Sequence, residues 1–173
     1  SGHKHLTSHS EARELLPWFR VATTIDRENV PAYEVGAFWL ARQVSKPEAA
    51  LKFIDEGLSA NPDAFELWHT KGRILKLVGD IRAAVGVFET AAETWVENRR
   101  QYERNPKEWP RMRRIPEPLD LAAIYTDLSD CMKRLGNQRE SLAFLAKALP
   151  YAQGDTRDTI RRRLREGGWT ERE

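Results

Sequence analysis

Residues 65–91 read FELWHTKGRILKLVGDIRAAVGVFETA and contain two amphipathic segments separated by Gly79-Asp80. Apolar and small residues recur at intervals of three and four in both segments, which places them on one face of an α-helix. Gly79 stands where a helix ends in a left-handed backbone conformation, which glycine adopts without strain. The pattern predicts antiparallel helices over about 64–78 and 81–104, whose key packing positions are Trp68, Gly72, Leu75, Ala84, Phe88 and Ala91.

Small residues at these positions allow the two helices to pack closely. Gly72 has no side chain, so the second helix can approach it, and Phe88 can fill the space between them. The spacing resembles the tetratricopeptide repeat, a helix-turn-helix unit of about 34 residues that stacks on copies of itself. The resemblance implies an all-α fold, a right-handed α-solenoid of antiparallel helix pairs.

The same spacing recurs on both sides of this segment. It is carried upstream by Tyr33, Gly36, Ala37, Leu40, Ala50, Ile54, Gly57 and Pro62, and downstream by Tyr125, Leu128, Ser129, Met132, Gly136-Asn137, Ser141, Leu145 and Ala148. Phe19, Ala22, Ile25 and Asp26 resemble the second half of a further repeat. We therefore predict a polar tail over 1–9 and a repeat domain over 10–153. The domain would comprise a partial repeat 10–29 and repeats 30–63, 65–98 and 122–153, followed by a capping helix and tail over 154–173.

Two proline-containing segments depart from a regular helix pattern. Four prolines between Pro106 and Pro118 forbid a regular helix, so we predict an insertion at about 99–118 between two repeats. Loops of this length inside a compact domain are often functional. Pro17 lies inside a helix expected over about 10–25, so that helix is either kinked or begins near Leu16.

The composition fits a helical domain with a large surface. Of the 173 residues, 40% are hydrophobic and 31% are charged, and no segment alternates polar and apolar residues for long enough to predict a strand. The single cysteine, Cys131, excludes an internal disulfide, and we expect it to be a buried thiol. No membrane-spanning run or signal peptide is apparent, so we expect no membrane contact from this segment. We expect a soluble domain that belongs to a longer bacterial protein; the sequence does not indicate its compartment.

The family resemblance implies a binding groove lined by the first helix of each repeat. An extended peptide with acidic groups could pair with Arg42, Arg73 and Lys76 in that groove. The Asn residues with which some family members hold a C-terminal carboxylate are missing, so that ligand is not indicated. The candidate groove residues are Glu34, Phe38, Arg42, His69, Arg73, Lys76, Thr126, Asp127, Asp130, Lys133 and Arg134. We predict a protein-interaction scaffold or adaptor that binds a protein or peptide partner.

Two alternatives remain open. Basic and aromatic residues are interleaved in the insertion and could bind a nucleic acid or another polyanion together with the last helix, although the net charge of only +2 argues against a general nucleic-acid binder. The candidate residues are Arg99, Arg100, Trp109, Arg111, Arg113 and Arg114. The second alternative is self-assembly into a homo-oligomer through an apolar edge left by the partial first repeat.

Neither catalysis nor a cofactor is predicted. The sequence has no Gly-rich phosphate loop, nucleophile elbow or metalloprotease His-Glu pair, so we predict that the protein is not an enzyme. His3, His5 and His9 stand at spacings that could surround a metal ion, but no Cys or acidic ligand of fixed geometry accompanies them. We read them as a polar tail and predict no metal site.

Overall fold

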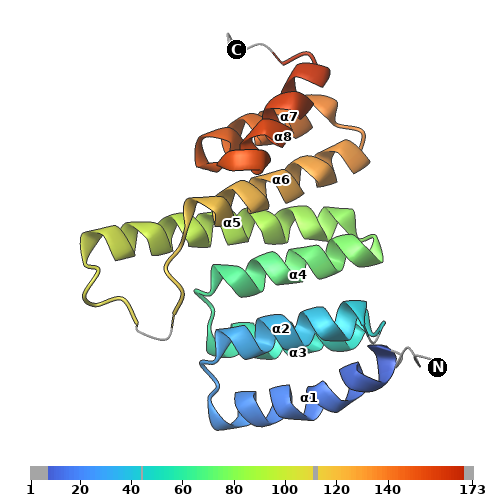
Figure 1. The fold of residues 1–173 in the computed structure, drawn as a ribbon, viewed down its shortest axis with the longest axis vertical. Helices are drawn as coiled ribbons and strands as arrows, with labels where there is room; N and C mark the ends of the chain where they lie inside the picture. The colour runs from blue at the N-terminus through green and yellow to red at the C-terminus, as the bar shows by residue number, and fades with distance from the viewer. Residues whose placement is uncertain (1–7, 44, 111–112, 170–173) are drawn as a thin grey trace, which may run out of the picture.

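The computed structural model describes residues 8–43, 45–110 and 113–169, which form helices stacked along one axis (Figure 1). The helices are α1 (Ser8–Ile25), α2 (Val30–Arg42), α3 (Pro47–Ala60), α4 (Phe65–Val78), α5 (Ile81–Arg104), α6 (Pro118–Arg134), α7 (Gln138–Ala148) and α8 (Gly154–Glu166), with a 3₁₀ turn at Leu149–Tyr151. No strand occurs within the described ranges. The predicted all-α solenoid is confirmed.

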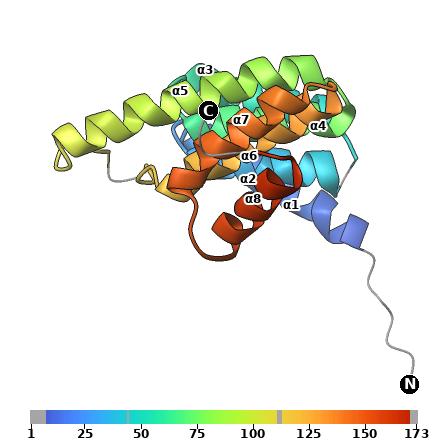
Figure 2. The ribbon, with the colours of Figure 1, turned by 90° about the horizontal axis from the view of Figure 1, so that it is seen from above.

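The helices are arranged as successive antiparallel pairs. Each of the pairs α2–α3, α4–α5 and α6–α7 packs closely, and α3 and α5 also contact the first helix of the next pair. Seen along the stack, α3 and α5 lie on one side, and α2 and α6 lie on the other (Figure 2). At the two ends of the stack, α1 packs on α2 and α8 packs on α7. The first helices of the pairs therefore share one face of the molecule.

Two of the turns within pairs use the same capping chemistry. Gly79 has φ 89° and Gly136 has φ 79°, so both glycines end a helix in the left-handed region. The next residue begins the following helix: Asp80 Oδ1 accepts a hydrogen bond from the backbone N–H of Ala83 at 3.2 Å, and Asn137 Oδ1 accepts one from Glu140 at 3.2 Å. The Gly-Asp and Gly-Asn dipeptides therefore fix both the end of one helix and the start of the next.

Small residues bring the helices of each pair into close contact. A Cβ atom on Gly72 would lie 2.5 Å from Phe88 Cδ1, and a Cβ on Gly36 would lie 2.5 Å from Phe53 Cε1. In the third pair, the buried hydroxyls of Ser129 and Ser141 are 3.0 Å apart and hydrogen-bond to each other. The first two layers thus fill the space over a glycine with an aromatic ring, whereas the third uses a polar contact between two small side chains.

The start of α1 and the end of α7 differ slightly from the predicted bounds. α1 begins at Ser8 and continues through Pro17, so the alternative that it begins near Leu16 is wrong. Within the predicted repeat 122–153, α7 ends at Ala148 and the chain continues as a 3₁₀ turn at Leu149–Tyr151. None of the described helices combines the length and apolar character needed to cross a membrane.

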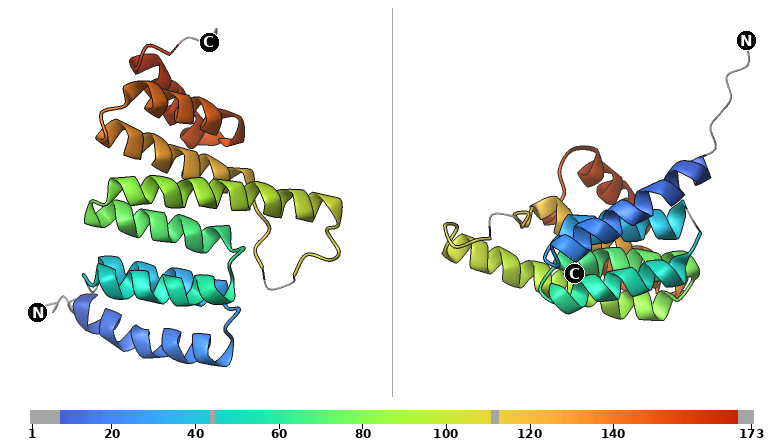
Figure 3. Two further views of the ribbon diagram at one scale, coloured as in Figure 1. Left: turned by 180° about the vertical axis from the view of Figure 1, so that it is seen from behind. Right: turned by 90° about the horizontal axis from the view of Figure 1, so that it is seen from below.

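The insertion is anchored to the stack by hydrogen bonds. α5 has 24 residues and runs through residues 99–104 of the predicted insertion, so the irregular segment is 105–117 (Figure 3). The indole N–H of Trp95 donates to the carbonyl of Glu117 at 3.1 Å, and the guanidinium of Arg99 donates to the carbonyl of Pro116 at 3.0 Å. Trp109 packs edge-on against Tyr102 of α5, with ring centres 6.1 Å apart. The segment therefore folds back beside the N-terminal ends of α4 and α6.

Candidate functional site

A pocket of about 380 Å³ opens on the face formed by α2, α4 and α6. Four cationic side chains and one carboxylate belong to its lining, together with apolar groups. The lining residues are Phe38, Ala41, Arg42, Thr70, Arg73, Ile74, Lys76, Leu77, Asp127 and Arg134. Since the pocket spans all three pairs, its shape depends on how the pairs stack. We call it the basic pocket.

An aromatic ring and two guanidinium groups form one part of the basic pocket. The guanidinium carbons of Arg42 and Arg73 each lie 5.6 Å from the centre of the Phe38 ring. Neither arginine has a carboxylate partner within the described part of the chain. Arg134 donates to the backbone carbonyl of Lys76 at 3.1 Å. These three arginines therefore present positive charge that no ion pair neutralises among the described residues.

Lys76, by contrast, is occupied by an internal ion pair. Asp127 of α6 accepts hydrogen bonds from Lys76 and from His69 Nε2, the latter at 2.8 Å. Burial alone raises the pKa of Asp127, but the hydrogen bonds from His69 and Lys76 outweigh it and bring the pKa below its ordinary value. Asp127 is therefore ionised and links α6 to α4. Lys76 is less available to a ligand than the three arginines.

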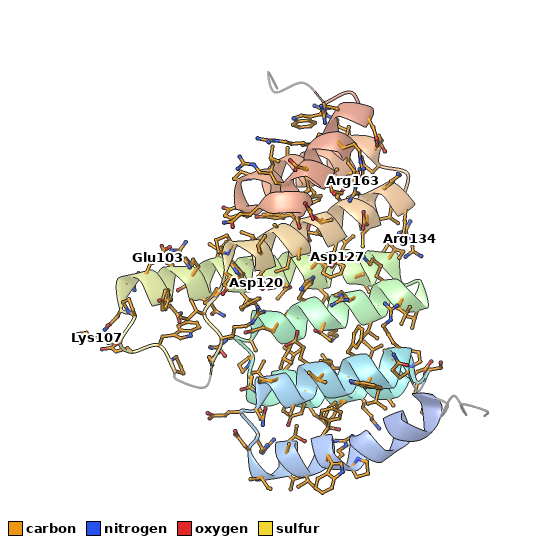
Figure 4. The ribbon with its side chains drawn as sticks, in the orientation of Figure 1. Glu103, Lys107, Asp120, Asp127, Arg134 and Arg163 are labelled. Carbon is orange, nitrogen blue, oxygen red and sulfur yellow. The ribbon has the colours of Figure 1, made fainter. Side chains whose placement is uncertain are left out.

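The structure brings some of the predicted groove residues together and separates others. Phe38, Arg42, Arg73, Lys76, Asp127 and Arg134 line the basic pocket. Asp130 instead pairs with Arg163 of α8 at 2.6 Å, and Lys133 lines a different depression beside α7. The hydroxyl of Thr126 is bonded to the carbonyl of Ala122. Figure 4 shows Asp120, Asp127 and Arg134 following one another along α6, from the end beside the insertion to the opposite end.

Several lining residues were missed by the sequence analysis. Thr70 and Leu77 fall at the same offsets in α4 as chosen residues in other repeats, so the repeat register could have found them. Ala41 falls at the same offset as Lys76 and Lys133 in their repeats but carries no polar group. Only the stacking of α2 on α4 reveals that Ile74 borders the pocket.

The opposite end of the groove is acidic. We define the acidic end as Glu34 of α2, Glu66 of α4 and Asp120 of α6. Arg114 of the insertion lies beside all three: it donates to Asp120 at 2.8 Å, and its Nε is 4.0 Å from Glu66 Oε1. Burial raises the pKa of both Glu34 and Glu66 above the ordinary value, although Arg114 partly offsets the effect. His69 also lies near Glu34, so it stands between the two ends of the groove.

The candidate arginines of the insertion that the structure describes each have a partner within the protein. Arg99 pairs with Glu103 at 2.6 Å, Arg100 pairs with Glu97, and Arg113 pairs with Asp63 and donates to its carbonyl at 2.7 Å. The guanidinium carbon of Arg113 also lies 5.2 Å from the ring centre of Trp109. Arg111 lies outside the described residues. The Arg-rich helix α8 lies at the C-terminal end of the stack, away from the insertion (Figure 1).

Metal-ligand residues and the thiol do not form a site in the described part of the molecule. No group of three or more His, Cys, Asp or Glu side chains there is arranged to hold a metal ion. His3 and His5 lie outside the described residues, and His9 lies in α1. Cys131 is fully buried, as expected, and burial raises the pKa of its thiol, which disfavours the reactive thiolate.

Solved structures with a similar arrangement of helices are tetratricopeptide-repeat proteins. YrrB, described as a tetratricopeptide protein with an unusual peptide-binding site, has a TM-score of 0.59 and 19% identity, and the alignment covers 84% of this chain and 62% of YrrB. TTC0263, a protein of Thermus thermophilus, has a TM-score of 0.62 and 18% identity over 91% of this chain and 73% of its own. MamA has a TM-score of 0.59 and 11% identity over 91% and 87%.

The sequence itself matches no protein-family model and no curated protein. Identities below one fifth leave the shared helix arrangement as the common property. The resemblance noticed in the sequence and the likeness in three dimensions agree on the same architecture. The chain has the fold of the tetratricopeptide-repeat proteins.

Proposed function

We propose that this chain is a non-enzymatic protein-interaction module that binds an extended acidic peptide across α2, α4 and α6. The acidic group of the peptide enters the basic pocket, and a neighbouring apolar side chain packs on Phe38. Such a ligand suits a groove in which Arg42 and Arg73 flank an aromatic ring and Arg134 lines the same pocket. That YrrB, a protein of similar fold, is described as having a peptide-binding site supports a peptide as the ligand.

One observation carries the proposal: Arg42 and Arg73 flank Phe38 and have no carboxylate partner among the described residues. Most other cations near the groove are neutralised internally, Lys76 by Asp127 and Arg163 by Asp130. Two guanidinium groups held together without a counter-ion repel each other and attract an anion. A carboxylate accepts two parallel hydrogen bonds from one guanidinium, which gives both affinity and orientation.

Charge reversal at Arg73 tests this proposal. A fluorescent peptide containing Glu-Leu-Glu should bind the wild-type domain, and the same peptide with Gln-Leu-Gln should bind much more weakly. Arg73→Glu should weaken binding of the acidic peptide by about 100-fold, because it removes a charge-assisted hydrogen bond and adds repulsion. Fluorescence anisotropy at low and high salt measures both effects, and the affinity should fall as salt rises.

The matched control is Arg82→Glu, which makes the same charge change at an exposed position on α5, outside the basic pocket. This variant should bind the acidic peptide almost as tightly as wild type. Equal losses in Arg73→Glu and Arg82→Glu would mean that only the overall charge matters. Undiminished binding by Arg73→Glu would remove the basic pocket as the site.

Self-assembly is a second candidate function, because α1 carries exposed apolar side chains. Trp18 is 71% exposed and Ile25 is 81% exposed, and Val21 lies between them on the same helix. Contiguous apolar surface of this kind is typical of association sites. Multi-angle light scattering should then show a mass that rises with concentration and returns to that of a monomer in Trp18→Glu. A constant monomer mass would exclude the α1 face as a self-association site.

A further inference from the structure

The acidic end contains a buried carboxylate that the protein does not satisfy. The side chain of Glu66 is only 4% exposed, and Glu66 Oε2 is the one buried side-chain nitrogen or oxygen in the described part of the chain without a hydrogen-bond partner. A buried polar atom without a partner is unfavourable and is rare in native proteins. Protonation would remove the charge of Glu66 but would not by itself give Oε2 a hydrogen-bond partner.

The position of Glu66 in its helix accounts for only part of its environment. It lies in the first turn of α4, where its own backbone amide lowers the pKa of the carboxyl. Burial nevertheless has the larger effect, and neighbouring Glu34 adds to it, so the pKa of Glu66 remains raised. The charges of Arg113 and Arg114 also favour ionisation but do not reverse the shift. The helix terminus and the internal cations therefore do not fully offset the effect of burial on the carboxyl of Glu66.

Arg114 is placed as a loose cover over this end. Its guanidinium is hydrogen-bonded to Asp120 and lies 5.5 Å from the ring centre of Phe65, but its Nε remains 4.0 Å from Glu66, beyond hydrogen-bond distance. The side chain of Arg114 is 51% exposed, and it belongs to the irregular segment rather than to a helix. The side chain of Arg114 can therefore move aside at a low energetic cost. The side chains of Asp127 and Arg163, by contrast, lie in helices and are each bonded to another helix.

We propose that Glu34, Glu66 and Asp120 receive a cationic side chain of the bound peptide, and that Arg114 covers this receptor until the peptide enters. The inference rests on the proposed function, because it assigns the opposite end of the same ligand. A guanidinium or ammonium group supplies the hydrogen-bond donors that Glu66 lacks. Its positive charge matches three carboxylates of which, among the described residues, only Asp120 is hydrogen-bonded to an internal cation, Arg114. The preferred ligand therefore carries an acidic group at one end and a basic group at the other.

The helix geometry sets the spacing of these two groups. Glu66 and Arg73 are seven residues apart on α4, and Glu34 and Arg42 are eight residues apart on α2, which corresponds to ~10–12 Å along a helix. An extended chain advances ~3.3 Å per residue, so the acidic and basic groups should be separated by about three to four residues. Phe38 lies one helical turn from both Glu34 and Arg42, which favours an apolar ligand residue between the charged ones.

Two peptides test this inference. Both contain Glu-Leu-Glu. The first, the Arg peptide, continues with a short neutral spacer to an Arg at the predicted distance. The second, the Gln peptide, differs only in having Gln in place of that Arg. The Arg peptide should bind wild type about tenfold more tightly than the Gln peptide, a gain typical of charge-assisted hydrogen bonds. Glu66→Gln and Glu34→Gln should abolish that gain and leave the affinity for the Gln peptide unchanged. Anisotropy titrations measure all affinities, and circular dichroism verifies that each variant is folded.

Arg114→Ala distinguishes a cover from a structural contact. Removal of the cover should raise the affinity for the Arg peptide several-fold and should not change the affinity for the Gln peptide. Lys107→Ala, at the tip of the insertion (Figure 4), is the matched control and should change neither. An unaltered affinity of Arg114→Ala for the Arg peptide would overturn the role of Arg114 as a cover.

The outcomes separate this inference from the proposed function. If both peptides bind wild type equally and lose affinity in Arg73→Glu, the acidic end is not a receptor and the basic pocket still stands. If Glu66→Gln keeps the full gain for the Arg peptide, the cation is bound elsewhere and the receptor assignment is wrong. If neither peptide binds, the proposed function fails, and the inference fails with it.

Discussion

Replacing Phe88 with alanine is expected to lower the free energy of unfolding by about 3–5 kcal/mol, the range typical of large-to-small changes in a packed core. The Phe88 side chain is fully buried, and its ring lies directly over Gly72. It also contacts the His69 ring edge-on, with centres 5.7 Å apart, so it supports a residue that bonds Asp127. Urea denaturation followed by circular dichroism measures the change. A loss below about 1 kcal/mol would contradict the packing described here.

A glycine in contact with Phe88 provides the control for this prediction. Gly72→Ala should destabilise the wild-type domain by about 1–3 kcal/mol through overpacking against the ring. In the Phe88→Ala background the same change should become neutral or stabilising, because the ring is gone and alanine is the better helix former by ~1 kcal/mol. Gly86→Ala should stabilise both backgrounds, since Gly86 is exposed on α5 with open space around it. The same cost of Gly72→Ala in both backgrounds would show that the ring is not the obstacle.

Replacing Asp127 with asparagine is expected to lower the free energy of unfolding by about 2–3 kcal/mol at neutral pH. The side chains of Asp127 and Lys76 are 17% and 23% exposed, so the ion pair is largely shielded from water. The variant keeps the shape of the side chain but leaves Lys76 with Asp130 alone, at 3.9 Å. Since Asp127 joins α6 to α4, its loss weakens the contact between two helix pairs. Chemical denaturation at neutral pH measures the effect.

The effect of Asp127→Asn should depend on pH in a defined direction. The folded protein holds the pKa of Asp127 below its ordinary value, so the carboxylate contributes stability at pH values above the unfolded pKa of about 3.9. That contribution is lost as the pH falls through the lower pKa of the folded state. The stability difference between wild type and Asp127→Asn should therefore persist at neutral pH and close below about pH 4. A stability difference that grows on acidification would contradict the claim that ionised Asp127 stabilises the contact between α4 and α6.

The features of the fold that depend on local sequence could be predicted. Gly79-Asp80 and Gly136-Asn137 set helix ends through backbone geometry and side-chain caps a few residues away, so a single sequence reveals them. Periodic small and aromatic residues likewise revealed which helix faces pack together. The start of α1 could not be placed in this way, because Pro17 favours a helix start or a kink, whereas the helix continues through it from Ser8.

The ion pairs that join separate layers of the stack could not be predicted. Lys76 and Asp127 are 51 residues apart, and Arg113 and Asp63 are 50 residues apart, so each pair exists only because separate layers stack in one register. From the sequence, Lys76 is expected to bind the ligand and Arg134 has no specific role. The structure shows Lys76 paired with Asp127 and Arg134 at the pocket without a carboxylate partner among the described residues. Glu66 became notable only through its burial and its unsatisfied oxygen.

Chemical-shift mapping of the isotopically labelled domain with the acidic peptide tests the central claim most directly. The amide signals that move should belong to residues 38–42, 70–77 and 127–134, which surround the basic pocket on three helices. Residues of α3 and α5 on the opposite side of the stack should keep their positions. Movements confined to α8 or to residues 105–117, or no movement at all at concentrations where the peptide is in large excess, would contradict the proposal that this groove binds acidic peptides.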